Sequence, residues 1–197
     1  MTQRAEDPER ARYRLDVVGT DMVAVVTSIG GWIVDRALAG WDVRVLLAEC
    51  SDDIPLRVLG ASAHDLCSTL ASASAAARPD AFAVAAALLR DDTLIRYRIA
   101  KALRHRKNDV TIWPEYEQGD RLAARRTVEH QLSHAAIAFK TRALLALDLP
   151  SEAAAPVEVV HVDCERWDVR NGVVTRFNRP DADFTKHRSH TTANIHR

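Results

Sequence analysis

Residues 12–48, RYRLDVVGTDMVAVVTSIGGWIVDRALAGWDVRVLLA, decide the fold. The runs Arg12–Val18 and Asp42–Ala48 are short and rich in β-branched residues, which is typical of strands. Between them Thr20 and Asp21 are candidate N-caps, and apolar residues then recur at near-helical spacing until Gly40. A strand, a helix and a strand within about 40 residues predict a right-handed βαβ unit with parallel strands.

A second interpretation of the same stretch stays open. Met22–Thr27 reads equally as a strand, Ser28–Gly31 as a turn and Trp32–Gly40 as a short helix. The adjacent glycines Gly30 and Gly31 favour it, because each costs about 1 kcal/mol inside a helix. The longer helix is preferred because it leaves Arg12–Val18 as the strand.

The middle of the chain is dominated by helical patterns. The patterns predict a short strand at 56–59, an Ala-rich helix running from the capping-box-like 62–65 to Ala77, a second helix over 81–90, a basic helix over 92–107 and a strand at 110–113.

The last third begins with a long predicted helix, Asp120–Leu147, and continues with a strand at Val157–Cys164. Asn171-Gly172 between two β-prone runs is the preferred type I′ hairpin turn. Its register pairs Val169 with Val174 and Trp167 with Arg176. The sequence therefore predicts an α/β fold with a mixed sheet: parallel N-terminal strands, helices packed on them and an antiparallel C-terminal hairpin at one edge.

The composition is that of one folded domain. Of 197 residues 47% are apolar, and 27 basic side chains balance 27 acidic ones, which excludes a disordered or collagen-like chain. We expect a flexible arm at 1–11, a single domain at 12–180 and a loose polar tail at 181–197.

No stretch predicts a membrane partner. The longest strongly apolar run, Phe82–Leu89, is far shorter than the roughly 20 residues that a membrane span needs. The charged N-terminus lacks the apolar core of a secretory signal, so a cytoplasmic protein is expected. Three widely spaced cysteines, at 50, 67 and 164, fit reduced thiols.

The first candidate site is the crevice at the carboxyl ends of the N-terminal strands, where open α/β sheets bind ligands near helix N-termini. A nucleotide or phosphorylated small molecule is the expected ligand, although the glycines do not form the G-x-G-x-x-G pattern. Close packing of a helix on the sheet is the alternative role of the paired glycines. The candidate ligand-binding residues are Gly19, Thr20, Asp21, Gly30, Gly31 and Glu49.

The second candidate is a metal site. His130 and His134 lie four apart on the predicted long helix, and His161 on the next strand is a possible third ligand. The neighbouring Arg125 and Arg126 oppose a cation, and two solvent-exposed or interface histidines explain the pair equally well.

The third candidate is the basic helix. Residues 90–107 contain seven basic and two acidic side chains, so they predict phosphate contacts in a nucleic-acid-binding regulator. The residues proposed for it are Arg96, Arg98, Lys101 and Arg104. A non-catalytic interaction module, which includes a possible homo-oligomer, is the remaining alternative. Neither a reaction nor a cofactor follows from these patterns.

Overall fold

A mixed seven-stranded sheet forms the centre of the molecule. The computed structural model describes residues 13–49, 52–71, 79–91, 93–94, 96–97, 109–113, 126–151, 154–163, 166–170 and 173–177. The strand order is β3-β2-β1-β4-β5-β7-β6. The strands are β1 (Arg14–Val18), β2 (Asp42–Leu47), β3 (Ala61–Asp65), β4 (Ala81–Ala85), β5 (Asp109–Trp113), β6 (Arg126–Gln131) and β7 (Val157–Asp163).

The predicted parallel pair at the N-terminus is confirmed. β1 pairs with β2 in parallel, with Val17 opposite Val45, and β4 pairs in parallel on the other side of β1. The parallel block continues to β3 and β5, whereas β7 runs antiparallel to both β5 and β6. From β1 the strands are added first on one side, as β2 and β3, and then on the other, as β4 and β5. The topological switch point therefore lies between β1 and β4, where sheets of this kind usually bind ligands.

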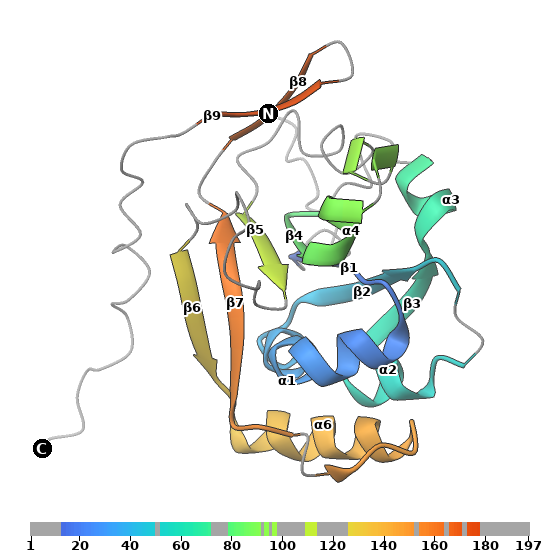
Figure 1. Ribbon diagram of the computed structural model, residues 1–197. Coiled ribbons are helices and arrows are strands. Elements are labelled where there is room, and N and C mark those ends of the chain that lie inside the picture. Colours follow the sequence, from blue (N-terminus) through green and yellow to red (C-terminus); the bar gives the residue numbers. More distant parts are fainter. Residues whose placement is uncertain are drawn as a thin grey trace, which may run out of the picture.

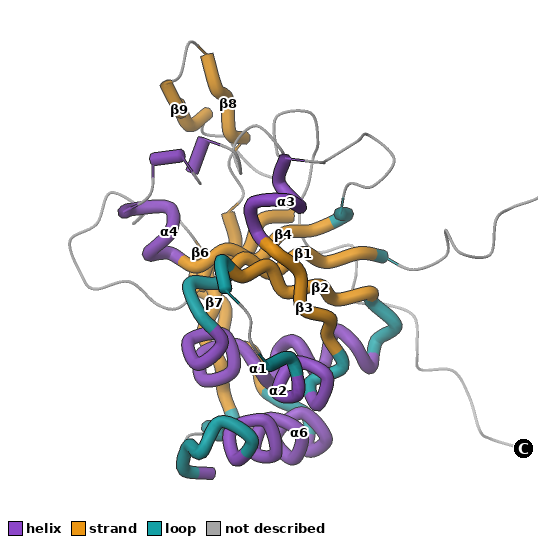
Figure 2. The backbone as a smooth tube through the Cα atoms, turned by 90° about the vertical axis from the view of Figure 1, so that its right-hand side faces the viewer, coloured by secondary structure: helices purple, strands orange, loops and turns teal. Residues whose placement is uncertain are grey.

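Helices cover both faces of the sheet. The helices are α1 (Met22–Leu38), α2 (Ile54–Val58), α3 (Leu66–Ala71), α4 (Ala86–Asp91) and α6 (His134–Leu145). α1 and α2 lie on one face, α3 and α4 lie on the other, and α6 packs on the outer side of α1 and α2 (Figures 1 and 2).

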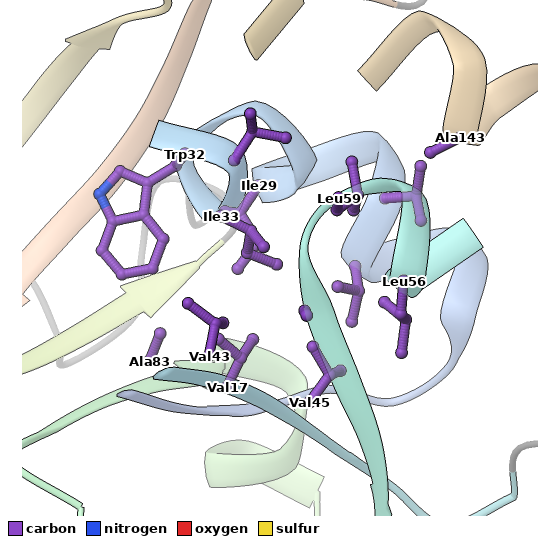
Figure 3. Close-up of a cluster of buried hydrophobic side chains, with 14 of the residues drawn as sticks. Val17, Ile29, Trp32, Ile33, Val43, Val45, Leu56, Leu59, Ala83 and Ala143 are labelled. Carbon is purple, nitrogen blue, oxygen red and sulfur yellow. The ribbon is translucent and has the colours of Figure 1, made fainter. Parts of the chain in front are cut away.

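The larger core lies between the sheet and α1. Side chains from alternate positions of the strands, such as Val17 and Val43, face Ile29 and Ile33 of α1 (Figure 3). Because successive strand residues point to opposite faces, Val18 and Leu46 belong to a second, smaller core under α3 and α4. Because both faces are covered, β4 and the C-terminal halves of β1 and β2 are apolar on both faces.

Residues 22–38 form one helix with an interruption near the paired glycines. The predicted helix over Met22–Leu38 is confirmed, and Asp21 caps it by accepting a hydrogen bond from the Ala24 amide. Met22–Thr27 is not a strand. However, the helix is interrupted at Ile29, whose φ and ψ of −136° and 15° are not helical, next to Gly30.

Three predictions in the middle of the chain are wrong. The strand expected at 56–59 is helix α2, which starts with Pro55 in its first turn, a position that proline favours. The capping-box-like Ser62–Asp65 belongs to β3, and its Asp65 rather than Ser62 accepts a bond from the start of α3. The helix expected over 81–90 begins as the buried strand β4, because a short apolar run fits a central parallel strand as well as a helix.

The predicted long helix Asp120–Leu147 is also wrong. Residues 126–131 form β6, and α6 begins only after Ser133, whose hydroxyl accepts a hydrogen bond from the Ala136 amide. Apolar residues recur at helical spacing from Val128 to Ala146, but the first of them belong to a strand and the later ones to a helix.

The Asn-Gly hairpin forms with the predicted register, Val169 opposite Val174 and Trp167 opposite Arg176. Its strands β8 (Arg166–Arg170) and β9 (Val173–Phe177) make a separate two-stranded sheet, so its predicted place at the edge of the main sheet is wrong. The arm 1–11 and the tail 181–197 lie outside the described residues. None of the helices in the described part of the chain has the length and apolarity to cross a membrane.

Candidate functional site at the carboxyl ends of the parallel strands

Side chains fill the space beside Gly19 at the carboxyl end of β1. A Cβ atom on Gly19 would lie 3.1 Å from Leu47 Cδ2 and 3.6 Å from Trp113 Cη2, and it would overlap Val25 Cγ2. Trp113 is completely buried. Gly19 is therefore required for close packing at this strand end.

Thr20 and Asp21, the next two predicted residues, are exposed at the start of α1. Asp21 Oδ1 accepts the Ala24 amide at 2.8 Å, and Asp21 Oδ2 accepts the Thr20 hydroxyl at 3.0 Å. The Asp21 carboxylate thus occupies one of the amide donors that a phosphate would use at this helix N-terminus.

An open hollow lies one strand further along the same edge. Its volume is about 490 Å³, and we call it the edge hollow. It is lined by Leu47, Ala48, Asp52, Asp53, Ala63, His64 and Asp65, which come from the ends of β2 and β3 and from the start of α2. Glu49, the predicted acid that follows β2, is exposed and does not line this hollow.

The acidic residues of the edge hollow also start helices. Asp52 Oδ1 accepts the Ile54 amide at 2.9 Å, and Asp53 lies 3.5 Å from the Arg57 guanidinium. Asp65 Oδ1 accepts the Ser68 amide at 2.7 Å, and this hydrogen bond lowers the pKa of Asp65 below its usual value. Three aspartates therefore line the hollow, and the lowered pKa of Asp65 keeps its side chain ionised at neutral pH.

His64 is the imidazole of the edge hollow. Its Nε2 lies 3.0 Å from the Ser62 hydroxyl, two residues earlier on the same face of β3. This hydrogen bond orients the ring and uses one of its two nitrogens. An imidazole beside carboxylates has the functional groups needed to accept and return a proton.

A buried ion pair lies on the same face of the sheet as His64. Arg44 on β2 donates to both carboxylate oxygens of Asp16 on β1, at 2.8 and 2.6 Å. Burial raises the pKa of Asp16, and this effect is larger than the opposing effect of Arg44. The two residues are cross-strand partners, so the pair fixes the register of β1 and β2.

Gly30 and Gly31 lie in the core, away from the strand ends. A Cβ on Gly31 would overlap Leu132, and its amide donates to Glu158 Oε1 at 2.9 Å. The structure supports the packing role that the sequence left open for these glycines.

The three candidate histidines are not brought together as metal ligands. His130 belongs to β6 opposite Glu158, whereas His161 on β7 lies three residues further on and so points to the other face of the sheet. His134 is the first residue of α6. Within the described residues, no group of three or more His, Cys, Asp or Glu side chains could hold a metal ion.

His130 has a different partner. Its Nε2 lies 2.8 Å from Asp35 Oδ2, and Asp35 Oδ1 accepts the Ser133 hydroxyl at 2.6 Å. Burial alone would raise the pKa of Asp35, but the hydrogen bonds from Ser133 and His130 outweigh it and lower the pKa. This cluster attaches α1 to the start of α6.

The basic helix is mostly outside the described residues. Arg96 is described, and its guanidinium approaches the Leu89 carbonyl at 3.5 Å, whereas Arg98, Lys101 and Arg104 are not described. Nucleic-acid binding through them stays a prediction.

Sequence reasoning missed the side chains of the edge hollow. His64 and Asp65 were assigned to a helix start, and Asp52 and Asp53 were not considered. The available signal was an acidic pair just after one strand and a His-Asp pair at the end of the next. It was hidden because β3 is Ala- and Ser-rich and lacks the usual β-branched pattern.

Neither a protein-family model nor a curated protein matches the chain. Several solved structures match the chain in fold. The chain is similar to known deacetylases and a hydratase in fold. The A40926 pseudoaglycone deacetylase Dbv21 matches with a TM-score of 0.57 and 15% identity, over 80% of this chain and 99% of that one. GalB, the 4-carboxy-2-hydroxymuconate hydratase of Pseudomonas putida KT2440, matches with a TM-score of 0.54 and 12% identity, over 76% and 95%.

The zinc-inhibited form of the teicoplanin deacetylase Orf2 matches with a TM-score of 0.52 and 12% identity, over 84% of this chain and 99% of that one. At these identities the likeness establishes a common α/β fold. The chain spans nearly the whole length of each of these neighbours.

Proposed function

We propose that this chain is an enzyme that adds water to a small polar molecule bound in the edge hollow. The observation that carries the proposal is an open hollow with an imidazole and carboxylates, at the carboxyl ends of parallel strands, in a fold that deacetylases and a hydratase share. Deacetylation and hydration have water addition in common. In one the bond to an acetyl carbon breaks, and in the other a double bond is saturated.

The role proposed for His64 is that of a general base. A base that removes a proton from water makes it a better nucleophile, and the proton then passes to the departing amine or to the neighbouring carbon. Asp16, which lies on the same face of the sheet and interacts electrostatically with His64, would stabilise the positively charged imidazole that forms between these steps. The described residues do not supply a ligand set for a metal ion, so the proposed proton transfer is assigned to side chains.

The charge of the edge hollow selects the proposed ligand. Asp52, Asp53 and Asp65 repel phosphate, so a neutral or cationic molecule with several hydroxyl or amide groups fits better than a nucleotide. N-acetylated amino sugars and the corresponding free amino sugars are suitable probes.

A nucleotide is the second candidate. The order β3-β2-β1-β4-β5 of the parallel strands favours it, because this is the arrangement of the doubly wound sheets that bind dinucleotides. Its site would be the loop Gly19–Asp21 rather than the edge hollow.

A thermal-shift panel separates the two candidates. The purified chain is heated with N-acetylglucosamine, glucosamine, ATP or NAD, each at 100 times or more its dissociation constant where binding is found. A ligand at that excess stabilises the folded state by about 3 kcal/mol. Stabilisation by the sugars supports the proposal, and stabilisation by ATP or NAD alone supports the second candidate.

A matched pair of variants locates the site. His64→Gln is expected to lower the affinity for the sugar, and the release of acetate measured by NMR, by at least tenfold. His134→Gln, an exposed histidine outside the hollow, is the control and should change neither. Equal effects of the two substitutions, or no binding of any sugar, would contradict the proposal.

A further inference from the structure

The outer surface of α6 is apolar. The side chains of the residues at positions 135, 138, 139, 142, 145 and 146 are all exposed, and they recur at helical spacing on one side of the helix. Five of these six residues are alanine, phenylalanine or leucine, and the sixth is Arg142. We call this surface the α6 stripe. Phe139 and Leu145, the two large apolar side chains of the stripe, are 45% and 51% exposed.

The α6 stripe is separate from the side of α6 that packs in the core. The opposite side of α6 already packs on α1 and α2, with Ala136, Ala143 and Leu144 fully buried. Lys140 also points to that inner side, where it binds Glu158. At 100° per residue the stripe is centred opposite Lys140, so α6 has one apolar face for its own core and a second one that faces outward from the outermost layer (Figures 1 and 2).

We propose that the α6 stripe is the contact surface of a homodimer, in which α6 packs antiparallel against α6 of a second copy. Self-complementarity is the argument for this occupant. A two-fold axis beside residue 140 places Ala135 opposite Leu145 of the second copy and Ala138 opposite its Arg142, so both of these longer side chains meet an alanine.

The single charge of the stripe also finds a complement in the second copy. The same pairing brings Phe139 next to Arg142 of the other copy, and the symmetry produces this contact twice. An arginine over an aromatic ring is attractive, whereas a guanidinium facing a different apolar protein surface would lose water without compensation. The absence of an acidic side chain from these six positions fits a partner that presents the same stripe.

The size of the stripe sets the strength of the dimer. One helix face supplies roughly half of the ~800 Å² that each partner contributes to a standard interface. The dimer should therefore be weak and concentration-dependent, with a dissociation constant on the order of 100 µM. This inference is independent of the proposed function, because the stripe and the edge hollow share no residues.

Sedimentation velocity of the full chain between about 5 and 500 µM tests the proposal. The unmodified chain should shift from monomer to dimer within that range. Leu145→Glu should raise the dissociation constant more than tenfold, since it places two carboxylates in apolar contacts opposite Ala135. Arg142→Ala should raise it about fivefold, through the loss of two ring contacts.

Leu38→Glu is the matched control. Leu38 is 62% exposed at the end of α1 and is not part of the stripe, so the dimer should persist in this variant. Circular dichroism melting of each variant verifies that it is folded, and Arg142→Ala provides the test if Leu145→Glu does not fold. A chain that stays monomeric at 500 µM, or a dimer that Leu38→Glu weakens as much as Leu145→Glu does, overturns the proposal.

Discussion

Two buried ion pairs in the described part of the chain differ in what they connect. Asp16–Arg44 joins neighbouring strands of the sheet, where the backbone ladder already fixes the geometry. Lys140–Glu158 joins α6 to β7, and both of its side chains are almost completely buried, at 1% and 2% exposure.

The pair Lys140–Glu158 also forms hydrogen bonds to backbone groups at the interruption of α1. Glu158 accepts the amides of Gly31 and Trp32, while Lys140 donates to the carbonyl of Thr27 at 2.7 Å. These are backbone groups on the two sides of the break at Ile29, which the interrupted helix leaves without their usual partners. The pair therefore substitutes for missing helical hydrogen bonds, whereas Asp16–Arg44 reinforces bonds that already exist.

Removing Glu158 should give the largest effect. Glu158→Ala leaves Lys140 as a buried, unpaired charge and leaves two buried amides unsatisfied, so the free energy of unfolding should fall by about 3–5 kcal/mol. Urea titration measures it. A loss below about 1 kcal/mol would show that the break does not depend on the pair.

Removing Arg44 should cost less, about 2–3 kcal/mol for Arg44→Met at pH 7, since its side chain is 15% exposed and the strands remain paired. The loss should shrink as the pH is lowered toward 4. The pKa of Asp16 is raised in the folded state, so protonation at low pH removes the buried charge that Arg44 otherwise compensates. A loss that does not change with pH would contradict this account.

Gly31→Ala tests how closely the backbone of α1 must pack where the pair Lys140–Glu158 binds it. The new methyl group overlaps Leu132, which should cost about 1–3 kcal/mol even though alanine favours a helix. Gly30→Ala is the matched control, because its Cβ would meet Leu59 and Lys140 only at ordinary distances of 3.5 and 3.6 Å. Calorimetric melting of both variants should show the larger decrease in Tm for Gly31→Ala.

Asp35 should give a smaller effect, which also disappears at low pH but for a different reason, because its folded-state pKa is lowered rather than raised. Its lowered folded-state pKa means that its ionised form stabilises the protein above the unfolded value of 3.8, and this contribution is lost as the pH falls below it. Asp35→Asn should therefore cost about 1 kcal/mol at pH 7 and almost nothing near pH 2.5. Unfolding curves at both pH values measure the difference.

The exposed pair Asp53–Arg57 should give the smallest effect. Its side chains are 47% and 69% exposed, so Arg57→Ala should change stability by less than about 0.5 kcal/mol. A larger loss would mean that exposed pairs in this molecule follow the same rule as buried ones.

The sequence predicted elements whose pattern is purely local. The strands β1 and β2, the helix between them and the register of the Asn-Gly hairpin depend on alternation, a cap and a turn type, all within a few residues. The Ala-rich strands β3 and β4 were taken for helices, because alanine has no strand preference until neighbouring strands enclose it.

The candidate site was also only partly predictable from the sequence. The order of strands and helices indicated that it lies at the carboxyl ends of the parallel strands, but not which strand ends border an open hollow. Trp113, far along the chain, fills the space beside Gly19, and the hollow lies instead next to His64. Which strand ends are filled depends on side chains brought together from β2, β5 and α1.

The sequence alone determined that residues 14–47 form a βαβ unit, because the spacing of apolar residues sets which faces must be buried. Tertiary structure decided how α1 tolerates two glycines in its middle. A helix break exposes backbone donors and acceptors to the core, and only side chains distant in sequence, Lys140 and Glu158, could satisfy them there.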